Sequence, residues 1–299
     1  MNGIQTISSE EYHSSTALSA SLAHILCSQS PLHAWTASHL NPNYKREDAE
    51  RFEIGTAAHA LLLEGNDGVA MIDAPDWRSK AARDERDAAR AEGKLPILGK
   101  HWNDIRAMVA ATGPQLDALK VDPPLLKDGK PEQSLFWEED GVQCRARLDW
   151  LRDDRATIDD YKTTKGSANP AAWTRTLYQI GADIQAAFYL RGLFRVDASD
   201  GPEVEWGTVP VFRFVVVEQT APYALSVVTL DDAAMELAER KVSYAIQTWK
   251  RCLETDTWPG YANRVCVAEL PGYEESRWLE HEANESALAY TDPGDEVPF

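Results

Sequence analysis

The stretch from residue 134 to residue 162 constrains the fold of this chain more than any other. It reads SLFWEE, Asp140-Gly141, VQCRARLDWL, an acidic turn at Asp153-Asp154, and ATIDDYK. Apolar and β-branched runs bounded by turn residues are typical of strands, and Asp-Gly is a preferred two-residue hairpin turn. We therefore expect three consecutive, neighbouring strands here.

Side-chain alternation groups the charged residues of these strands on shared faces. Successive side chains along a strand point to opposite faces. Arg145, Arg147 and Asp149 then share one face of the second strand, and Asp160 and Lys162 share one face of the third. A tight turn between the two strands is expected to bring Asp149 near Asp160.

The expected pair of Asp149 and Asp160 has a chemical consequence. Two carboxylates held close together repel each other unless a cation or a proton lies between them. Their oxygens suit a hard divalent ion such as Mg²⁺ or Mn²⁺, which can polarise a phosphoryl oxygen and deprotonate a bound water. Lys162 could orient that water or stabilise developing negative charge. The alternative is a solvated hairpin with ordinary surface charges.

The rest of the chain predicts a mixed α/β protein. The segments with helical periodicity or composition are 17–28, 49–64, 78–93, 101–119, 170–195 and 231–254. Two further strand patterns occupy residues 209–218 and 223–230. We expect one domain over residues 1–283 and an acidic tail over residues 284–299.

The net charge of −18 argues at first against nucleic acid, because phosphate binding usually needs a basic surface. The charge is unevenly distributed, however. Residues 267–299 carry nine acidic residues and one arginine, whereas residues 142–195 carry nine basic and six acidic residues. Residues 78–106 carry eight basic and five acidic residues. The global charge therefore does not exclude DNA as a ligand.

Cysteine usage and hydropathy predict a cytoplasmic protein. The four cysteines are scattered and form no CxxC pair, so neither a disulfide framework nor a zinc knuckle is expected. No apolar run approaches the roughly 18–20 residues of a membrane span. A signal peptide has a basic segment followed by an apolar one, and the N-terminus shows no such pattern. We expect no membrane partner.

An ordered set of short motifs runs through the first two thirds of the chain. The set consists of Ser19-Ala-Ser21, Ser30-Pro31, the run from Gly55 through His59 to Glu64, Glu132, Arg147-Leu-Asp149, Asp160-Tyr-Lys162, and the run from Gln185 to Tyr189. In this order it resembles the PD-(D/E)xK nuclease superfamily, in particular the exonuclease VIII (RecE-type) branch of phage recombination exonucleases. The resemblance implies a restriction-endonuclease-like α/β fold, with a mixed central sheet flanked by helices.

The resemblance also implies roles for individual residues. Asp149 and Asp160 correspond to metal-binding carboxylates, and the backbone carbonyl of Tyr161 to a further metal ligand. Lys162 corresponds to the catalytic lysine. His59 corresponds to a metal ligand carried by a helix, for which the alternative is a packed helix histidine.

Further residues have supporting roles in this interpretation. Gln185 and Tyr189 lie four residues apart, share a helix face, and correspond to a pair that positions phosphate or water. The alternative is an ordinary contact in the core. Glu64 lies five residues after His59, roughly 140° further round a helix, which favours a supporting or structural role over direct ligation. Glu132 is likewise expected to orient rather than ligate.

Two alternative roles are open for Arg145 and Arg147. They could contact the DNA backbone, or they could balance the neighbouring acids.

The activity implied by the resemblance is that of a Mg²⁺-dependent exodeoxyribonuclease, with Mn²⁺ as an alternative ion. It would degrade linear double-stranded DNA 5′→3′ and leave 3′ single-stranded overhangs for annealing-type recombination. The family also implies a ring-shaped homo-oligomer. Cys252 and Cys266 do not supply the cluster that an iron–sulfur branch needs, and no GxxxxGK[ST] loop is present. We therefore expect neither an iron–sulfur cluster nor a requirement for ATP.

Two other activities stay open at this point. One is an endonuclease or a single-strand-specific nuclease of the same fold. The other is a catalytically idle DNA-binding or adaptor protein, against which the intact set of Asp149, Asp160 and Lys162 speaks.

The last residues carry a separate signal. The sequence from Asp295 through Val297, Pro298 and Phe299 resembles the acidic tip of bacterial single-stranded-DNA-binding proteins. Such tips dock a terminal Phe and its carboxylate into basic pockets. This favours recruitment of a partner such as a single-strand annealing protein, and the alternative is a plain disordered acidic tail.

Overall fold

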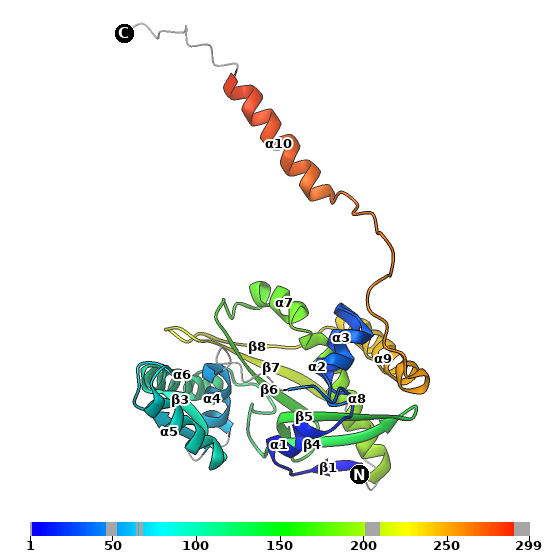
Figure 1. Cartoon of the computed structure of the whole chain (residues 1–299). Helices are drawn as coiled ribbons and strands as arrows, with labels where there is room; N and C mark the ends of the chain where they lie inside the picture. Colours follow the sequence, from blue (N-terminus) through cyan, green and yellow to red (C-terminus); the bar gives the residue numbers. More distant parts are fainter. Residues whose placement is uncertain (1, 46–52, 64, 66–67, 201–209, 290–299) are drawn as a thin grey trace, which may run out of the picture. The chain divides into compact units, whose positions relative to one another are not determined.

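The computed structural model describes residues 2–45, 53–63, 65, 68–200 and 210–289 (Figure 1). The chain divides into two compact units, residues 1–260 and residues 261–299. The sequence-based boundary between residues 283 and 284 lies inside the second unit. No helix in the described ranges is long and apolar enough to span a membrane.

A six-stranded mixed sheet forms the centre of the first unit. Its strands, in spatial order, are β1 (Gly3–Gln5), β4 (Gly129–Glu139), β5 (Val142–Arg152), β6 (Thr157–Thr164), β7 (Val211–Glu218) and β8 (Leu225–Val228). All neighbours are antiparallel except β6 and β7, which run parallel. The mixed central sheet predicted from the sequence is confirmed.

The hairpin of β4 and β5 forms as its Asp-Gly pair predicts. Asp140 and Gly141 both have positive φ, 52° and 82°, as a type I′ turn requires. The turn sets the register of the whole ladder, beginning with Glu139 opposite Val142.

The link between β5 and β6 is short, and the ladder between them covers only two residue pairs. Trp150 lies opposite Asp159, and Leu151 lies opposite Ile158.

The parallel pair of β6 and β7 is joined by a helical crossover. It contains α7 (Pro170–Gln179) and α8 (Ala182–Asp200). The sequence predicts one continuous helical stretch here, but the chain breaks at Gly181, which has a φ of 70°. His24 packs against this glycine, and a Cβ there would lie 2.3 Å from His24 Nδ1. The break therefore serves a tertiary contact that helical periodicity does not reveal.

The larger hydrophobic core joins the sheet to several helices. These are α2 (Ala20–Ser28), α3 (Pro31–Thr36), α7, α8 and α9 (Asp232–Thr255). Trp137 and Phe188 pack with ring centroids 4.9 Å apart, and Trp249 is 1% exposed. A short helix, α1 (Ser9–Ser14), covers β5 through Tyr12.

A second core holds the segment between α3 and β4. This segment contains α4 (Glu53–Leu63), β2 (Val69–Ile72), α5 (Lys80–Ala91), β3 (Leu95–Leu98) and α6 (Gly99–Ala118), and β2 and β3 form a parallel pair. Val215, Val217 and Tyr161 face this core, while Phe212, Phe214 and Val216 of β7 face the larger one. Alternation along β6 and β7 thus buries both faces of the sheet.

The second unit contains α10 (Gly272–Ala289), a region for which the sequence predicts no helix. Large apolar side chains in this unit are exposed, among them Val265 at 94% and Trp278 at 60%.

Candidate active site

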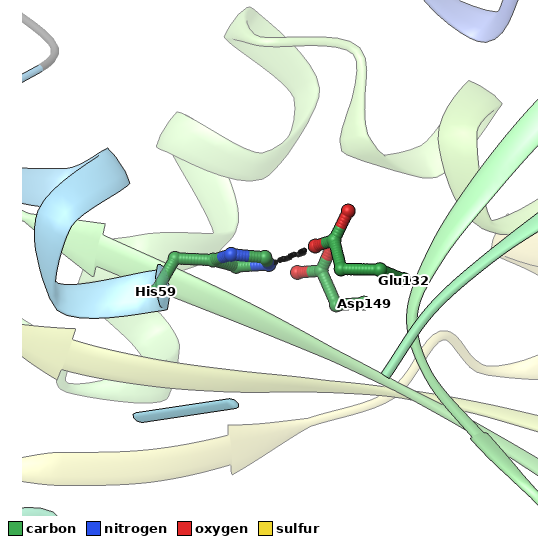
Figure 2. Close-up of side chains that lie close together, drawn as sticks. All are labelled: His59, Glu132 and Asp149. Carbon is green, nitrogen blue, oxygen red and sulfur yellow. Dashed lines mark ion pairs between the residues drawn. The ribbon is translucent and has the colours of Figure 1, made fainter. Parts of the chain in front are cut away.

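Three side chains from separate elements converge at the central sheet (Figure 2). His59 of α4 places its Nε2 3.2 Å from Oδ1 of Asp149 on β5 and 3.3 Å from Oε1 of Glu132 on β4. One ligand atom from each residue lies within 4.8 Å of the other two. The side chains are 20%, 17% and 18% exposed respectively, so solvent reaches the cluster.

Glu132 enters the cluster through a left-handed backbone conformation, with a φ of 55°. Such a conformation costs a non-glycine residue about 1–3 kcal/mol and is found mostly where function or packing enforces it. The flanking pairs of the ladder place Glu132 opposite Asp149. Its Oε2 pairs with Arg147, which also donates to the carbonyl of Ile7 at 3.0 Å. Arg147 and His59 together hold the carboxylate in place.

Helix α4 approaches β6 closely because it carries a glycine at the contact. A Cβ on Gly55 would lie 2.8 Å from Oγ1 of Thr163. His59 follows one turn later on the same helix face. The glycine therefore sets how near His59 comes to the sheet.

Asp149 and Asp160 lie close together at the point where β5 and β6 stop pairing. Oδ2 of Asp149 accepts the backbone N–H of Tyr161 at 2.9 Å. The Asp160 side chain is 1% exposed, and its Oδ1 pairs with Lys162. Its Oδ2 accepts from Nε2 of Gln185 at 2.7 Å. Asp160 thus links the lysine to helix α8.

Burial and charge shift the proton affinities of these groups. Burial alone lowers the pKa of His59, but the carboxylates of Asp149 and Glu132 raise it to about 9. Burial and the nearby Asp149 carboxylate raise the pKa of Asp160 to about 6. Burial opposes the charge on Lys162, yet Asp160 and Asp149 outweigh it and raise the pKa of that amine. Lys162 is therefore a cation at neutral pH.

The donor set fits a divalent metal ion. Burial raises the pKa of Asp149, but the cationic His59 and Lys162 outweigh it and hold that pKa below its ordinary value. The two carboxylates offer oxygen atoms that suit hard ions such as Mg²⁺ or Mn²⁺, and the imidazole offers a nitrogen atom that suits transition metals, so the set fits a divalent cation without selecting one. A cation bound to His59, Glu132 and Asp149 would take the place of the proton that His59 otherwise carries. Ligation by Asp160 and by the Tyr161 carbonyl stays a prediction.

Helix α8 supports the site through Gln185 and Tyr189. Burial raises the pKa of the Tyr189 hydroxyl well above its ordinary value, and a hydrogen bond with Gln185 opposes that shift. The Tyr189 ring packs edge to face on Phe212, with centroids 6.0 Å apart. Gln185 thus contacts both Asp160 and Tyr189, and the role of the pair in positioning phosphate or water stays a prediction.

Arg145 and Arg147 of β5 are engaged by the protein itself. Arg145 is 7% exposed, donates to the carbonyl of Tyr12 and stacks over the Tyr12 ring at 4.8 Å. Arg147 is occupied by Glu132. These contacts favour the charge-balancing and structural reading of both residues, and DNA contact by either stays a prediction.

Two hollows meet at Asp149. One, of about 1010 Å³, runs past α1, α2 and the segment after α3 and is also lined by Glu132, Arg147 and Tyr189. The other, of about 860 Å³, runs past α4 and the carboxyl ends of β6 and β7. Asp149 therefore lies at the middle of an extended depression of the surface.

Some of the predicted residues lie outside the described part of the chain. These are Glu64 and the tail residues Val297, Pro298 and Phe299. Their roles stay predictions.

Residues 25–270 match the sequence family described as a PDDEXK-like domain of unknown function (DUF3799). The chain belongs to this family. Membership confirms the superfamily resemblance. The correspondence of Asp149, Asp160 and Lys162 to the motif residues of that superfamily stays a prediction. A search of curated proteins gave no match.

Solved structures give the PDDEXK-like chain a fold relative. A crystal structure described as a candidate exonuclease from Eubacterium rectale superposes with a TM-score of 0.57 at 13% identity, covering 90% of this chain and 98% of the other. A phage-related exonuclease from Haemophilus somnus gives a TM-score of 0.34 at 11% identity, covering 83% of this chain and 99% of the other. That second superposition is too loose to support any argument. The first shows the shared fold.

Glu132 lies in the cluster itself, whereas the sequence predicts that it orients another ligand; whether it binds the metal directly is not decided by its position. A signal for it exists in the sequence. An Asp140-Gly141 hairpin turn pairs Glu139 with Val142, and continuing that register to Asp149 reaches Glu132 on the partner strand. The left-handed φ of Glu132 has no comparable signal.

Proposed function

We propose that this PDDEXK-like protein is a divalent-metal-dependent deoxyribonuclease, with Mg²⁺ as its ion. The proposal rests on how the metal-ligand cluster and the lysine are arranged. A cluster of His59, Glu132 and Asp149 lies beside a buried Asp160 that holds Lys162. A metal-ligand set next to a fixed cation is what phosphodiester hydrolysis needs.

Each part of the site has a task in this proposal. A bound Mg²⁺ supplies Lewis acidity toward a phosphoryl oxygen and lowers the pKa of a bound water. Lys162 keeps its proton and places positive charge where the phosphate becomes more negative. Asp160 and Gln185 fix the position of Lys162, because Asp160 contacts both. Burial of Asp160 strengthens that attraction by keeping water away.

We further propose linear double-stranded DNA as the substrate, degraded 5′→3′ to leave 3′ overhangs for annealing-type recombination. The support is the resemblance of the motif set to phage recombination exonucleases. The same resemblance supports a ring-shaped homo-oligomer. The sequence of Val297, Pro298 and Phe299 supports recruitment of a single-strand annealing protein.

The test uses linear duplexes labelled at either the 5′ or the 3′ end, together with a closed circle, all in Mg²⁺. The proposal predicts early release of the 5′ label, late release of the 3′ label and an intact circle. Lys162→Ala should abolish release, whereas Lys250→Ala on α9 should leave it unchanged. Cleavage of the circle would instead identify an endonuclease. Activity confined to single strands would contradict the duplex assignment, and metal binding without any cleavage would indicate an adaptor.

A further inference from the structure

The hollow of about 860 Å³ extends beyond the catalytic cluster. Besides His59, Asp149, Tyr161 and Lys162, its lining consists of Gly55, Thr56, Thr163, Thr164, Lys165 and Gln219. These residues lie on α4 and at the carboxyl ends of β6 and β7. The nuclease chemistry proposed above gives the polar residues among them no task, although the hollow opens directly onto Asp149.

The wall of this hollow is polar, and hydrogen bonds hold its residues in place. Nε2 of Gln219 donates to Oγ1 of Thr163 at 2.9 Å, and the Gln219 backbone N–H donates to the carbonyl of Thr164 at 2.9 Å. Oγ1 of Thr164 accepts the N–H of Gly166 at 3.1 Å. These bonds fix the chain on both sides of Lys165.

Lys165 differs from the other cations around the site. Lys162 pairs with Asp160, and Arg147 pairs with Glu132. Lys165 is exposed and has no carboxylate partner among the described residues. An uncompensated ammonium group beside a polar hollow attracts an anion.

The spacing suits a phosphate next to the one that is cut. Lys165 follows Lys162 by three residues, so their Cα atoms are at most roughly 10 Å apart. Successive phosphates of one DNA strand lie closer together than that, and a lysine side chain spans the remainder. Lys162 and Lys165 can therefore engage neighbouring phosphates of one strand.

We propose that this hollow is a subsite for the phosphodiester adjacent to the scissile one, with Lys165 as its cation. This proposal rests on the nuclease function proposed above. The neighbouring hydroxyls and the amide of Gln219 line the subsite, and Gly55 keeps α4 close enough to β6 to close it on one side. Lys165 binds the substrate and takes no part in the bond-breaking step.

The first measurement compares the steady-state kinetics of the full chain with those of Lys165→Ala, Lys165→Arg and the distant control Lys250→Ala. Lys165→Ala should raise KM for DNA about tenfold, the size of one charged contact, and leave kcat within about twofold. Lys165→Arg should have a KM close to that of the unaltered chain. A fall in kcat with an unchanged KM would overturn the proposal, as would unchanged kinetics.

The second measurement is DNA binding by anisotropy across a range of salt concentrations in the cleavage-deficient Lys162→Ala background. Losing one phosphate contact should reduce the slope of log affinity against log salt by about 0.7–0.9. Lys250→Ala should leave the slope unchanged, and equal slopes with and without Lys165 would overturn the proposal. This measurement needs no cleavage, so it decides on the subsite even if the unaltered protein proves inactive, an outcome that would count against the nuclease function alone.

Neutral methylphosphonates placed singly on either side of the cleaved bond identify the phosphate. At one of the two positions the neutral group should weaken binding by the unaltered protein but not by Lys165→Ala. If both proteins lose affinity equally at both positions, Lys165 does not contact an adjacent backbone phosphate. If the variant differs only in its affinity for a free mononucleotide, the hollow holds the released product, which also overturns the proposal.

Discussion

At the scale of single residues, Glu132 carries the most information about function. It is a non-glycine residue at a φ of 55° within a strand, it faces Asp149, and it contacts both His59 and Arg147. A strained backbone held by two cationic partners is expected where a carboxylate must point in one direction. The sequence identifies the residue types of this site, whereas only the folded backbone shows where Glu132 points.

Two substitutions of Glu132 separate the effect of its backbone strain on stability from the effect of its carboxylate. Glu132→Ala and Glu132→Gly both lose the ion pair with Arg147, but only alanine keeps a Cβ at the positive φ. We expect the Gly variant to be more stable than the Ala variant by about 1 kcal/mol. Urea unfolding of the two metal-free proteins measures this difference. An Ala variant equal to or more stable than the Gly variant would show that the backbone at this position is not strained.

The carboxylate of Glu132 is expected to contribute to metal affinity. Glu132→Gln should weaken Mn²⁺ or Mg²⁺ binding by about 10–100-fold, because it removes one charged oxygen donor or its orientation. Isothermal titration calorimetry with the metal alone measures this affinity without any nuclease assay. Glu138→Gln, an exposed glutamate of the same strand, is the matched control. Equal affinities of both variants would remove Glu132 from the metal site.

At the scale of elements, features set by local turn residues were predictable, whereas features set by tertiary packing were not. The Asp140-Gly141 hairpin and the closeness of Asp149 to Asp160 follow from alternation and turn residues. The break between α7 and α8 depends on the packing of His24 against Gly181, which lies far from it in the sequence. The short strands β1, β2 and β3 carry too few residues for a periodic signal.

The contact between α4 and β6 yields a test at this scale. Gly55→Ala places a Cβ 2.8 Å from Oγ1 of Thr163 and should push α4, with His59, away from the sheet. We expect a loss of about 1–3 kcal/mol in unfolding free energy together with weaker metal binding. Adding Thr163→Ala removes the clashing atom and should recover part of both losses. A double variant no better than Gly55→Ala would show that this contact does not set the position of α4.

At the scale of the whole molecule, the two units contribute differently. The sheet, both hydrophobic cores and the candidate site all lie within residues 1–260. The second unit carries exposed apolar side chains and none of the described site residues. The α10 helix within it is not predicted from the sequence.

A chain ending at Gly260 tests this division. It should keep its melting temperature within about 2 °C, since the described apolar side chains after residue 260 are exposed and add little burial. It should also keep Mg²⁺-dependent nuclease activity, while any binding of an annealing protein through the tail should disappear. Differential scanning calorimetry and nucleotide release measure the first two properties. A large drop in melting temperature would show that the second unit stabilises the first.

Metal-dependent DNA cleavage at the cluster around Asp149 underlies every function proposed for this protein. The most direct measurement is the release of acid-soluble nucleotide from linear duplex DNA by the full chain and by Asp149→Asn, with Mg²⁺ and with a chelator. We expect release only by the unaltered chain and only with the metal. Release by Asp149→Asn at the unaltered rate, or release in the chelator, would contradict this expectation.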